Sequence, residues 1–372
     1  WWPHMPERPT FWLVSARWAR ASTVSAKTHY PVSPMLWTRL YLVFALYVVL
    51  IGCKKPVDSE PSVVWNVPET PEHFGAQFIP NDNPLSALKW ELGRQLFFDP
   101  QLSSDGSTSC SSCHLPSHAF GGSSPTAPGV GGALGTRNVP VLSNIGWHPY
   151  FTREGGVPTL EMQVLVPIQE TNELNHNIVL IAEQLNSDSL YVRMTQDAFG
   201  LDPSPYTITR ALSAFERTLI SGTSAYDRWL EGDASALSQA ALHGHDVFES
   251  IGCGQCHSGP QFSDFELRNN GLFVVYPDSG LYRLTLNPDD IGKFKTASLR
   301  NLSYSAPYMF DGSVATLDDV INQYAQGGSN HFNQDAAIQP FEITAAERMD
   351  LKAFLGALDD PQFVAWGETL AP

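Results

Sequence analysis

The chain has 372 residues, 43% of them hydrophobic and 11% aromatic, and a formal net charge of −16 at pH 7. This composition is that of a globular protein with enough length for two domains, which excludes a disordered or fibrous chain. The acidic balance makes nucleic acids and anionic lipid surfaces poor partners and favours a cationic protein partner, although such a charge more commonly serves only solvation.

Residues 1–34 begin with Trp, are rich in Trp, Arg and Pro, and show no apolar period. We therefore interpret Met35 as the natural first residue, and residues 1–34 as translated sequence from upstream of the true start. The residues that follow resemble a signal peptide, because Arg39 precedes an apolar run and Leu50-Ile51-Gly52-Cys53 resembles a bacterial lipobox. This pattern predicts a lipoprotein signal over 35–52, lipidation of Cys53, and a mature protein on the periplasmic side of a bacterial membrane. The alternative is a single membrane-spanning helix, but the apolar run over 40–51 is shorter than the roughly 20 residues that a span needs.

The segment after the signal is predicted to be a tether. Residues 53–82 are rich in Pro, Glu and Asn, which is typical of an extended linker between an anchor and a folded body. Residues 1–52 contain five basic side chains and Glu7, so their removal would change the formal net charge to about −20.

Helical periodicity dominates the remainder of the chain. Apolar residues recur at spacings of three and four in three stretches. They are Leu85, Leu88, Leu92 and Leu96; Ile208, Leu212, Phe215 and Leu219; and Leu351, Phe354, Leu355 and Leu358. Thr344 and Glu347 form a capping box before the last of these. No alternating strand pattern persists, so we predict a mainly α fold with long Gly- and Ser-rich loops, such as residues 121–135.

Two short motifs carry the chemistry. Cys110-Ser111-Ser112-Cys113-His114 and Cys253-Gly254-Gln255-Cys256-His257 both have the form C-x-x-C-H, which attaches a c-type haem. The two thiols form thioethers with the haem vinyl groups, and the adjacent His binds the iron. The four cysteines could instead hold zinc or form disulfides, but neither explains why His follows each pair directly. We therefore predict two covalent haems in two cytochrome c-like helical domains, over 83–225 and 226–372.

Four further stretches resemble the bacterial dihaem cytochrome c peroxidases and their relatives of the MauG and MbnH type. They are GTRNVPVLSN (135–144), TLEMQVLVPIQETNEL (159–174), KTASLRNLSYSAPYMFDG (295–312) and TLDDVINQYAQGG (316–328). Each is weakly specific alone, but their order around two haem motifs is specific. The resemblance spans residues 83–360 and implies that H₂O₂ reacts at the N-terminal haem, while a protein partner supplies electrons through the C-terminal haem.

The family pattern Gln-x3-Pro-x5-Glu matches Gln163, Pro167 and Glu173. Peroxide cleavage needs a base that takes a proton and returns it to the departing oxygen, and Glu173 is the candidate. Gln163 would form a hydrogen bond with the peroxide oxygens, whereas Pro167 limits the width of the pocket and interrupts the local helix. The alternative for Glu173 is an ordinary solvated acid.

The loop before Asn138 predicts an open first haem. Many relatives place a blocking His eight residues before this Asn, but Val130 occupies that position here, among Gly129, Gly131 and Gly132. His118 lies only four residues after His114, so we expect it on the proximal side. The resemblance thus implies a five-coordinate first haem, as in MauG.

The second haem has two candidate sixth ligands. Leu317, Val320, Ile321 and Tyr324 form one helical face, and a phenol on an inward face needs a partner. Tyr324 lies where the resemblance implies an axial Met in peroxidases and an axial Tyr in MauG-type enzymes. A phenolate would stabilise higher iron oxidation states. The rival ligand is the thioether of Met309, and a third reading makes Tyr324 an ordinary core residue.

The sequence also departs from the family pattern. Phe310 replaces the usual His of PYMHDG, and Arg153 stands where relatives have a Trp between the haems, so a relay through Trp147, Tyr150 or Phe151 is an alternative. The family's calcium site, an Asn and two carbonyls, maps onto Asn138, Ser305 and Pro307, and such oxygen ligands suit Ca²⁺, so the resemblance implies one calcium ion.

These observations predict a lipid-anchored dihaem peroxidase that draws electrons from a protein partner, and the MauG and MbnH resemblance makes that partner a substrate that is oxidatively modified; a cytochrome or copper protein is a candidate electron donor. Two alternatives stay open: a peroxidase for peroxide detoxification, and an electron-transfer cytochrome without catalysis.

Overall fold

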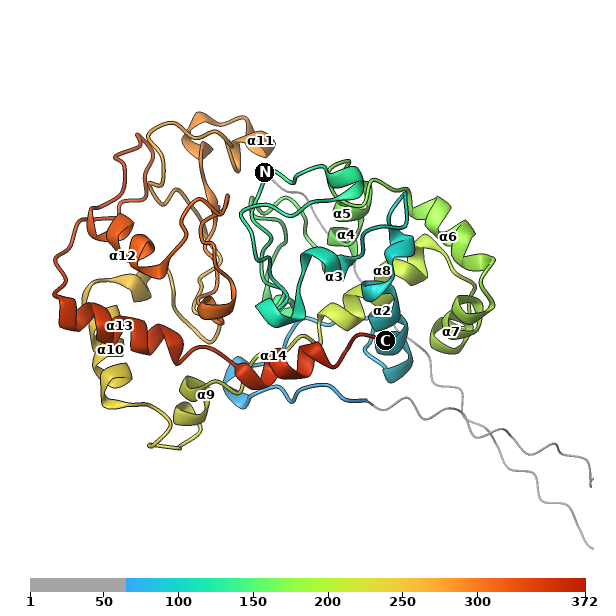
Figure 1. Cartoon of the computed structure of the whole chain (residues 1–372), viewed down its shortest axis with the longest axis horizontal. Helices are drawn as coiled ribbons and strands as arrows, with labels where there is room; N and C mark the ends of the chain where they lie inside the picture. The colour runs from blue at the N-terminus through green and yellow to red at the C-terminus, as the bar shows by residue number, and fades with distance from the viewer. Residues whose placement is uncertain (1–64) are drawn as a thin grey trace, which may run out of the picture. The chain divides into compact units, whose positions relative to one another are not determined.

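The computed structural model describes residues 65–372, and Cys53 with the predicted signal peptide lies outside this range (Figure 1). The described chain is mostly helical with very little strand, which confirms the predicted mainly α fold. None of its helices has both the length and the apolar character needed to cross a membrane.

Among residues 65–372, seven helices belong to the half that contains the first C-x-x-C-H motif. They are α2 (Ala87–Phe98), α3 (Cys110–Cys113), α4 (Leu160–Gln163), α5 (Leu165–Gln169), α6 (Ile178–Asn186), α7 (Ser189–Phe199) and α8 (Pro205–Glu216). The second half contains α9 (Ala225–Leu230), α10 (Gln239–Ser250), α11 (Tyr282–Thr285), α12 (Leu317–Ala325), α13 (Ala345–Gly356) and α14 (Pro361–Glu368), with two short antiparallel strands, β1 (Leu267–Arg268) and β2 (Phe294–Lys295).

Each motif follows a helix that crosses a second helix at a glycine. On α2, a Cβ atom at Gly93 would lie 2.0 Å from the Ala211 carbonyl oxygen of α8. On α10, a Cβ atom at Gly244 would lie 1.9 Å from the Asp350 carbonyl oxygen of α13. Only glycine permits backbones to approach this closely, so both crossings depend on it.

Most residues of the predicted helical stripes form the cores beside these crossings, but Leu88 of the first stripe is exposed. Ile208, Leu212 and Phe215 of α8 are buried with Leu92 and Leu96 of α2. Leu351, Phe354 and Leu355 of α13 form a second buried cluster with Val247 and Phe248 of α10. The predicted capping box is present, because the Thr344 hydroxyl accepts from the Glu347 N–H at 3.2 Å and the Glu347 carboxylate accepts from the Thr344 N–H at 2.8 Å.

The C-terminal helix packs against the first core, although it follows the second haem motif in the chain. Phe363 and Val364 of α14 are buried in the first cluster, and the Phe363 ring lies 5.7 Å from that of Phe120. In Figure 1, α14 lies between the group of α10, α12 and α13 and the group of α2 to α8. The last helix therefore ties the two halves together.

Residues 65–82 belong to the predicted tether, yet they contact the folded body. The Phe74 ring is buried and lies 5.3 Å from Trp147, and the His73 Nε2 atom lies 2.9 Å from the Asp227 carboxylate. Gln77 donates a hydrogen bond to the Arg217 carbonyl at 3.2 Å. This part of the segment is thus fixed to the body and does not serve as a free linker.

Candidate haem and peroxide site

Both C-x-x-C-H motifs line one large cavity of about 1140 Å³. This volume exceeds the usual range for a single small ligand, roughly 300–1,000 Å³, and so has room for two cofactors. Apolar side chains from α10, α12 and α13 cover the wall near the second motif; they are Phe248, Leu317, Val320, Ile321, Leu351 and Leu355.

The four motif cysteines are free thiols. Burial raises the pKa of Cys113 to about 11 and of Cys253 to about 12, and it raises the pKa of Cys110 and Cys256 as well. No group of three or more His, Cys, Asp or Glu side chains in residues 65–372 is placed to hold a metal ion. The unpaired thiols are available for the thioether bonds that haem attachment requires.

Both motif histidines are held in the orientation that an iron ligand needs. The Nδ1–H group of His114 donates to the Phe120 carbonyl at 2.9 Å, and that of His257 donates to the carbonyls of Phe262 and Ala297, both at 3.1 Å. A carbonyl only accepts, so Nδ1 carries the proton and Nε2 keeps its lone pair. Burial lowers the pKa of both imidazoles, which keeps them neutral. Such a second hydrogen bond fixes the tautomer of metal-bound histidines.

Gln163, Pro167 and Glu173 all line the same cavity as Cys110, Cys113 and His114. Helix α4 ends at Gln163, whose carbonyl would be the helical partner of the N–H that Pro167 lacks. The Gln163 Oε1 atom is buried without a hydrogen-bond partner in the structure. A buried polar atom of this kind calls for a partner, and a bound ligand would supply one.

The Glu173 carboxylate has no ion pair or hydrogen bond within residues 65–372. Burial, together with the nearby Glu170 carboxylate, raises the pKa of Glu173 above its ordinary value. An unpaired acid with a raised pKa is suited to exchange a proton with a ligand.

The glycine-containing loop lies against the backbone of Glu173. The Val130 N–H donates to the Glu173 carbonyl at 2.9 Å, and a Cβ atom at Gly129 would lie 2.5 Å from that same oxygen. His118 does not line the cavity, and its proximal position stays a prediction. His148 does line it, and its Nδ1 atom lies 3.2 Å from the Lys295 ammonium; sequence reasoning did not identify this residue.

Tyr324 and Met309 both line the cavity, and Asn270 connects them. The Asn270 amide lies 3.3 Å from the Tyr324 hydroxyl and 3.4 Å from the Met309 sulfur, and it donates toward both. Burial raises the pKa of Tyr324, whereas the hydrogen bond from Asn270 lowers it. The choice between the two ligands stays a prediction, and sequence spacing gave no signal for Asn270.

Phe310, which replaces the usual His of the family pattern, and some of the candidate relay residues lie at the cavity wall. Phe310 stacks on Phe294 with ring centroids 4.1 Å apart and an interplanar angle of 12°, and both rings line the cavity. Of the residues named as alternative relays, Phe151 lines the cavity, whereas Trp147 packs on Phe74. Tyr150 does not line it and donates a hydrogen bond to the Phe265 carbonyl. Sequence reasoning missed the stacked Phe294–Phe310 pair.

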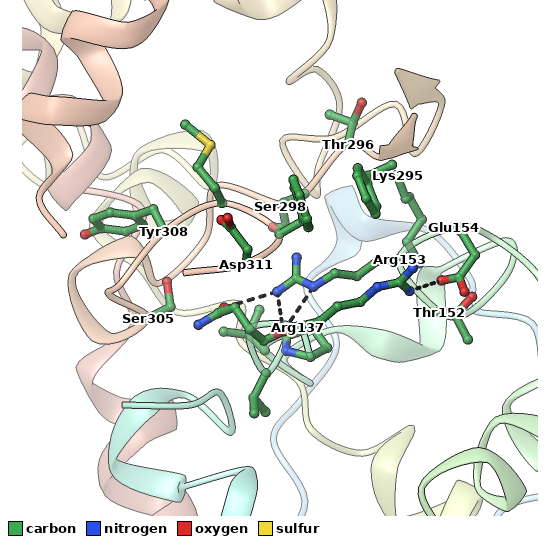
Figure 2. Close-up of a pocket in the computed structure, with 18 of the residues that line it drawn as sticks. Arg137, Thr152, Arg153, Glu154, Lys295, Thr296, Ser298, Ser305, Tyr308 and Asp311 are labelled. Atoms are coloured by element: carbon green, nitrogen blue, oxygen red, sulfur yellow. Dashed lines mark hydrogen bonds and ion pairs between the residues drawn. The ribbon is translucent and has the colours of Figure 1, made fainter. Parts of the chain in front are cut away.

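One of the predicted calcium residues, Asn138, has another partner at its oxygen atoms. Arg153 donates to both the carbonyl and the side-chain oxygen of Asn138 (Figure 2). The Ser305 hydroxyl donates to the Leu302 carbonyl at 3.4 Å, and Ser305 and Pro307 line the cavity. A calcium ion would need the Asn138 oxygens that Arg153 holds, so this arrangement does not fit Ca²⁺.

Comparison with known proteins now identifies the family. The family described as di-haem cytochrome c peroxidase matches residues 87–235. The methylamine utilization protein MauG from Methylorubrum extorquens is 36% identical over 286 residues, which cover 75% of this chain and 80% of that protein. The chain belongs to the dihaem cytochrome c peroxidase family.

Other members give the same result. Cytochrome-c peroxidase IdrP1 from Denitromonas iodatirespirans is 34% identical over 76% of this chain and 87% of its own length. The crystal structure of a MauG-like protein associated with microbial copper homeostasis covers 81% of this chain and 96% of that protein, with a TM-score of 0.76 and 35% identity. The dihaem peroxidase is therefore an oxidoreductase, and its free thiols, oriented imidazoles and large cavity fit two haem c groups.

Proposed function

We propose that this dihaem peroxidase reduces H₂O₂ beside the N-terminal haem without prior reduction and takes the two electrons from a protein partner through the C-terminal haem. One observation carries the proposal. Two polar groups without partners in residues 65–372, the Gln163 oxygen and the Glu173 carboxylate, line the cavity beside His114, and the loop at Val130 contains no histidine.

The bound haem would supply the iron that binds peroxide and exchanges electrons. His114 would hold this iron through Nε2 from the proximal side, since its Nδ1–H is bonded to the Phe120 carbonyl. Glu173 would take one peroxide proton and return it to the departing oxygen, and the Gln163 amide would orient the peroxide. The complete reaction converts H₂O₂, two protons and two electrons into two water molecules.

The test is electron paramagnetic resonance of the fully oxidised, haem-loaded protein. We expect a high-spin ferric signal from the N-terminal haem as isolated, because the described residues offer no histidine on its distal loop. His114→Ala should remove this signal and leave that of the second haem, which assigns it. Two low-spin haems in the wild-type protein would contradict the proposal and favour a non-catalytic cytochrome.

We further propose that the electrons come from an aromatic side chain of a protein partner, which is modified by their loss. The similarity to MauG and to a MauG-like protein associated with copper homeostasis supports a protein substrate, including a copper protein. The similarity to cytochrome-c peroxidase IdrP1 supports the second candidate, peroxide removal with a small donor protein. Candidate donors can be mixed with peroxide and analysed by mass spectrometry; recovery of every donor unmodified after turnover would favour peroxide removal.

We also propose that Cys53 anchors the protein by lipidation on the periplasmic side of a bacterial membrane. The tetrapeptide that ends at Cys53 supports this. Cys53→Ala should move the protein from the membrane fraction to the soluble fraction with both haems attached. Unchanged membrane association would instead favour an uncleaved helix.

A further inference from the structure

A guanidinium group contacts the Asn138 oxygens that the family resemblance assigns to a calcium ion. The Arg153 Nη2 atom donates to the Asn138 carbonyl at 2.8 Å and to its Oδ1 atom at 3.1 Å, and Nε donates to the same carbonyl at 3.1 Å. Figure 2 shows Arg153 extended alongside Arg137, with dashed lines from its guanidinium group. Asn138 is itself buried, with 6% of its surface exposed, so its oxygens have few other partners.

Arg153 differs from its neighbour Arg137 in forming no ion pair, although the charges of Asp311 and Glu154 act on it from nearby. Arg137 forms ion pairs with Glu154 and with Asp278, the latter at 2.6 Å. Within residues 65–372, no carboxylate forms an ion pair with Arg153. A partly buried cation without a carboxylate in direct contact is unfavourable, and such groups usually have an anionic partner.

Lys295 is a second basic side chain of the same kind, and burial together with the Arg153 charge lowers its pKa to about 7. Its ammonium group donates to the Tyr150 carbonyl at 2.8 Å and lies 3.2 Å from the His148 Nδ1 atom, but it forms no ion pair within the described chain. The main-chain N–H of Lys295 donates to the main-chain carbonyl of Arg153 at 2.6 Å, which places the two residues side by side. Both line the cavity that contains the four haem-attaching cysteines.

The anion that these cations lack is one that the cofactors would bring. Each haem carries two propionate carboxylates, and two haems would share this cavity. Arg153 presents donors in a planar fork that suits a carboxylate, while Lys295 provides a point charge. Asp311, an acid of the cavity wall whose charge acts on Arg153, forms no ion pair with it and accepts from the Ser313 N–H at 3.1 Å.

We propose that Arg153 and Lys295 form a fixed cationic site that binds haem propionates and takes the place of a bound calcium ion between the two haem sites. Arg153 holds the Asn138 oxygens that a metal would need, and its charge repels a second cation. The protein therefore needs no calcium to keep its haem environment. This inference rests on the binding of two haems and is independent of how peroxide reacts.

The first test measures metal binding by the haem-loaded protein. Wild-type protein, dialysed and analysed by mass spectrometry, should contain no stoichiometric calcium, and a chelator should leave its paramagnetic resonance spectrum unchanged. Titration with CaCl₂ should give no heat of binding at micromolar protein. One calcium ion retained per chain, or a spectrum that changes with the chelator, would overturn the inference.

The second test measures the reduction potential of each haem by spectroelectrochemistry. Arg153→Gln removes a positive charge that favours the reduced haem, so we expect the one-electron equilibrium of at least one haem to move about tenfold toward the oxidised form, or about 59 mV. Lys295→Gln should lower the reduction potential in the same way. Arg153→Lys keeps the positive charge, so its reduction potentials should stay close to those of the wild type. Arg193→Gln, on the surface of α7, removes the same charge at a distant position and is the matched control.

Equal potentials in Arg153→Gln and Arg193→Gln would overturn the inference. If Arg153→Gln does not fold, the comparison of Lys295→Gln with Arg193→Gln decides in the same way.

Discussion

Replacement of Glu173 by Gln tests the role of the distal acid most directly. The substitution keeps the size of the side chain and removes its ability to accept a proton. General acid–base catalysis contributes about 10²–10⁴-fold, so we expect kcat/KM for peroxide to fall by that factor, which corresponds to about 3–5 kcal/mol in the activation free energy. The assay follows peroxide consumption by the haem-loaded protein with a reduced donor, and it includes the haem spectrum to verify that both haems remain.

The pH profile gives a second, independent readout of Glu173. Burial raises the pKa of Glu173, and the nearby Glu170 raises it further. A base must be deprotonated in the free enzyme, so kcat/KM should rise with pH and level off above a pKa higher than the ordinary value of 4.5. Glu170→Gln removes the like charge and should shift this rise to lower pH, whereas Glu183→Gln on the exposed face of α6 should leave it unchanged.

Two results would refute this reasoning. Activity of Glu173→Gln within about twofold of the wild type would mean that another group moves the proton. A pH profile that is identical in the wild type and in Glu173→Gln would show that the observed titration belongs to a different residue.

Three further predictions address the second haem and the stability of the fold. Tyr324→Phe should change the paramagnetic resonance spectrum of the second haem while Met309→Leu leaves it unchanged; the reverse result would assign Met309 as the ligand. Asp227→Asn should lower the free energy of unfolding by about 3–5 kcal/mol, measured with denaturant, because it breaks a fully buried pair with Arg300. Burial opposes ionisation of Asp227, but the hydrogen bonds from Arg300 lower its pKa below the ordinary value. The contribution of this pair to the free energy of unfolding should therefore be lost as the pH falls. Equal unfolding midpoints of Asp227→Asn and the wild type would contradict the prediction. Burial raises the pKa of Glu216 to about 8, so stability should decrease by roughly 1.4 kcal/mol per pH unit between about pH 5 and 8, and Glu216→Gln should flatten this decrease.

The sequence alone predicted the features that depend on local chemistry. Each haem attachment site occupies five consecutive residues, so Cys110–His114 and Cys253–His257 are recognisable without tertiary structure. The spacing of Gln163, Pro167 and Glu173 is also local, and all three line one cavity. The mainly α fold followed from apolar stripes at helical spacing, because burial of one helix face requires this pattern.

Tertiary structure decided the contacts between residues that are distant in the chain. Asn270 reaches both Met309 and Tyr324, which lie 39 and 54 residues away in sequence, and no local pattern marks it. The sequence identified Arg153 only as a missing aromatic residue, whereas folding places its guanidinium on the Asn138 oxygens and Lys295 beside it. A replacement at one position becomes a cationic site only when packing brings a second cation and two oxygen acceptors to it, and that information resides in the fold.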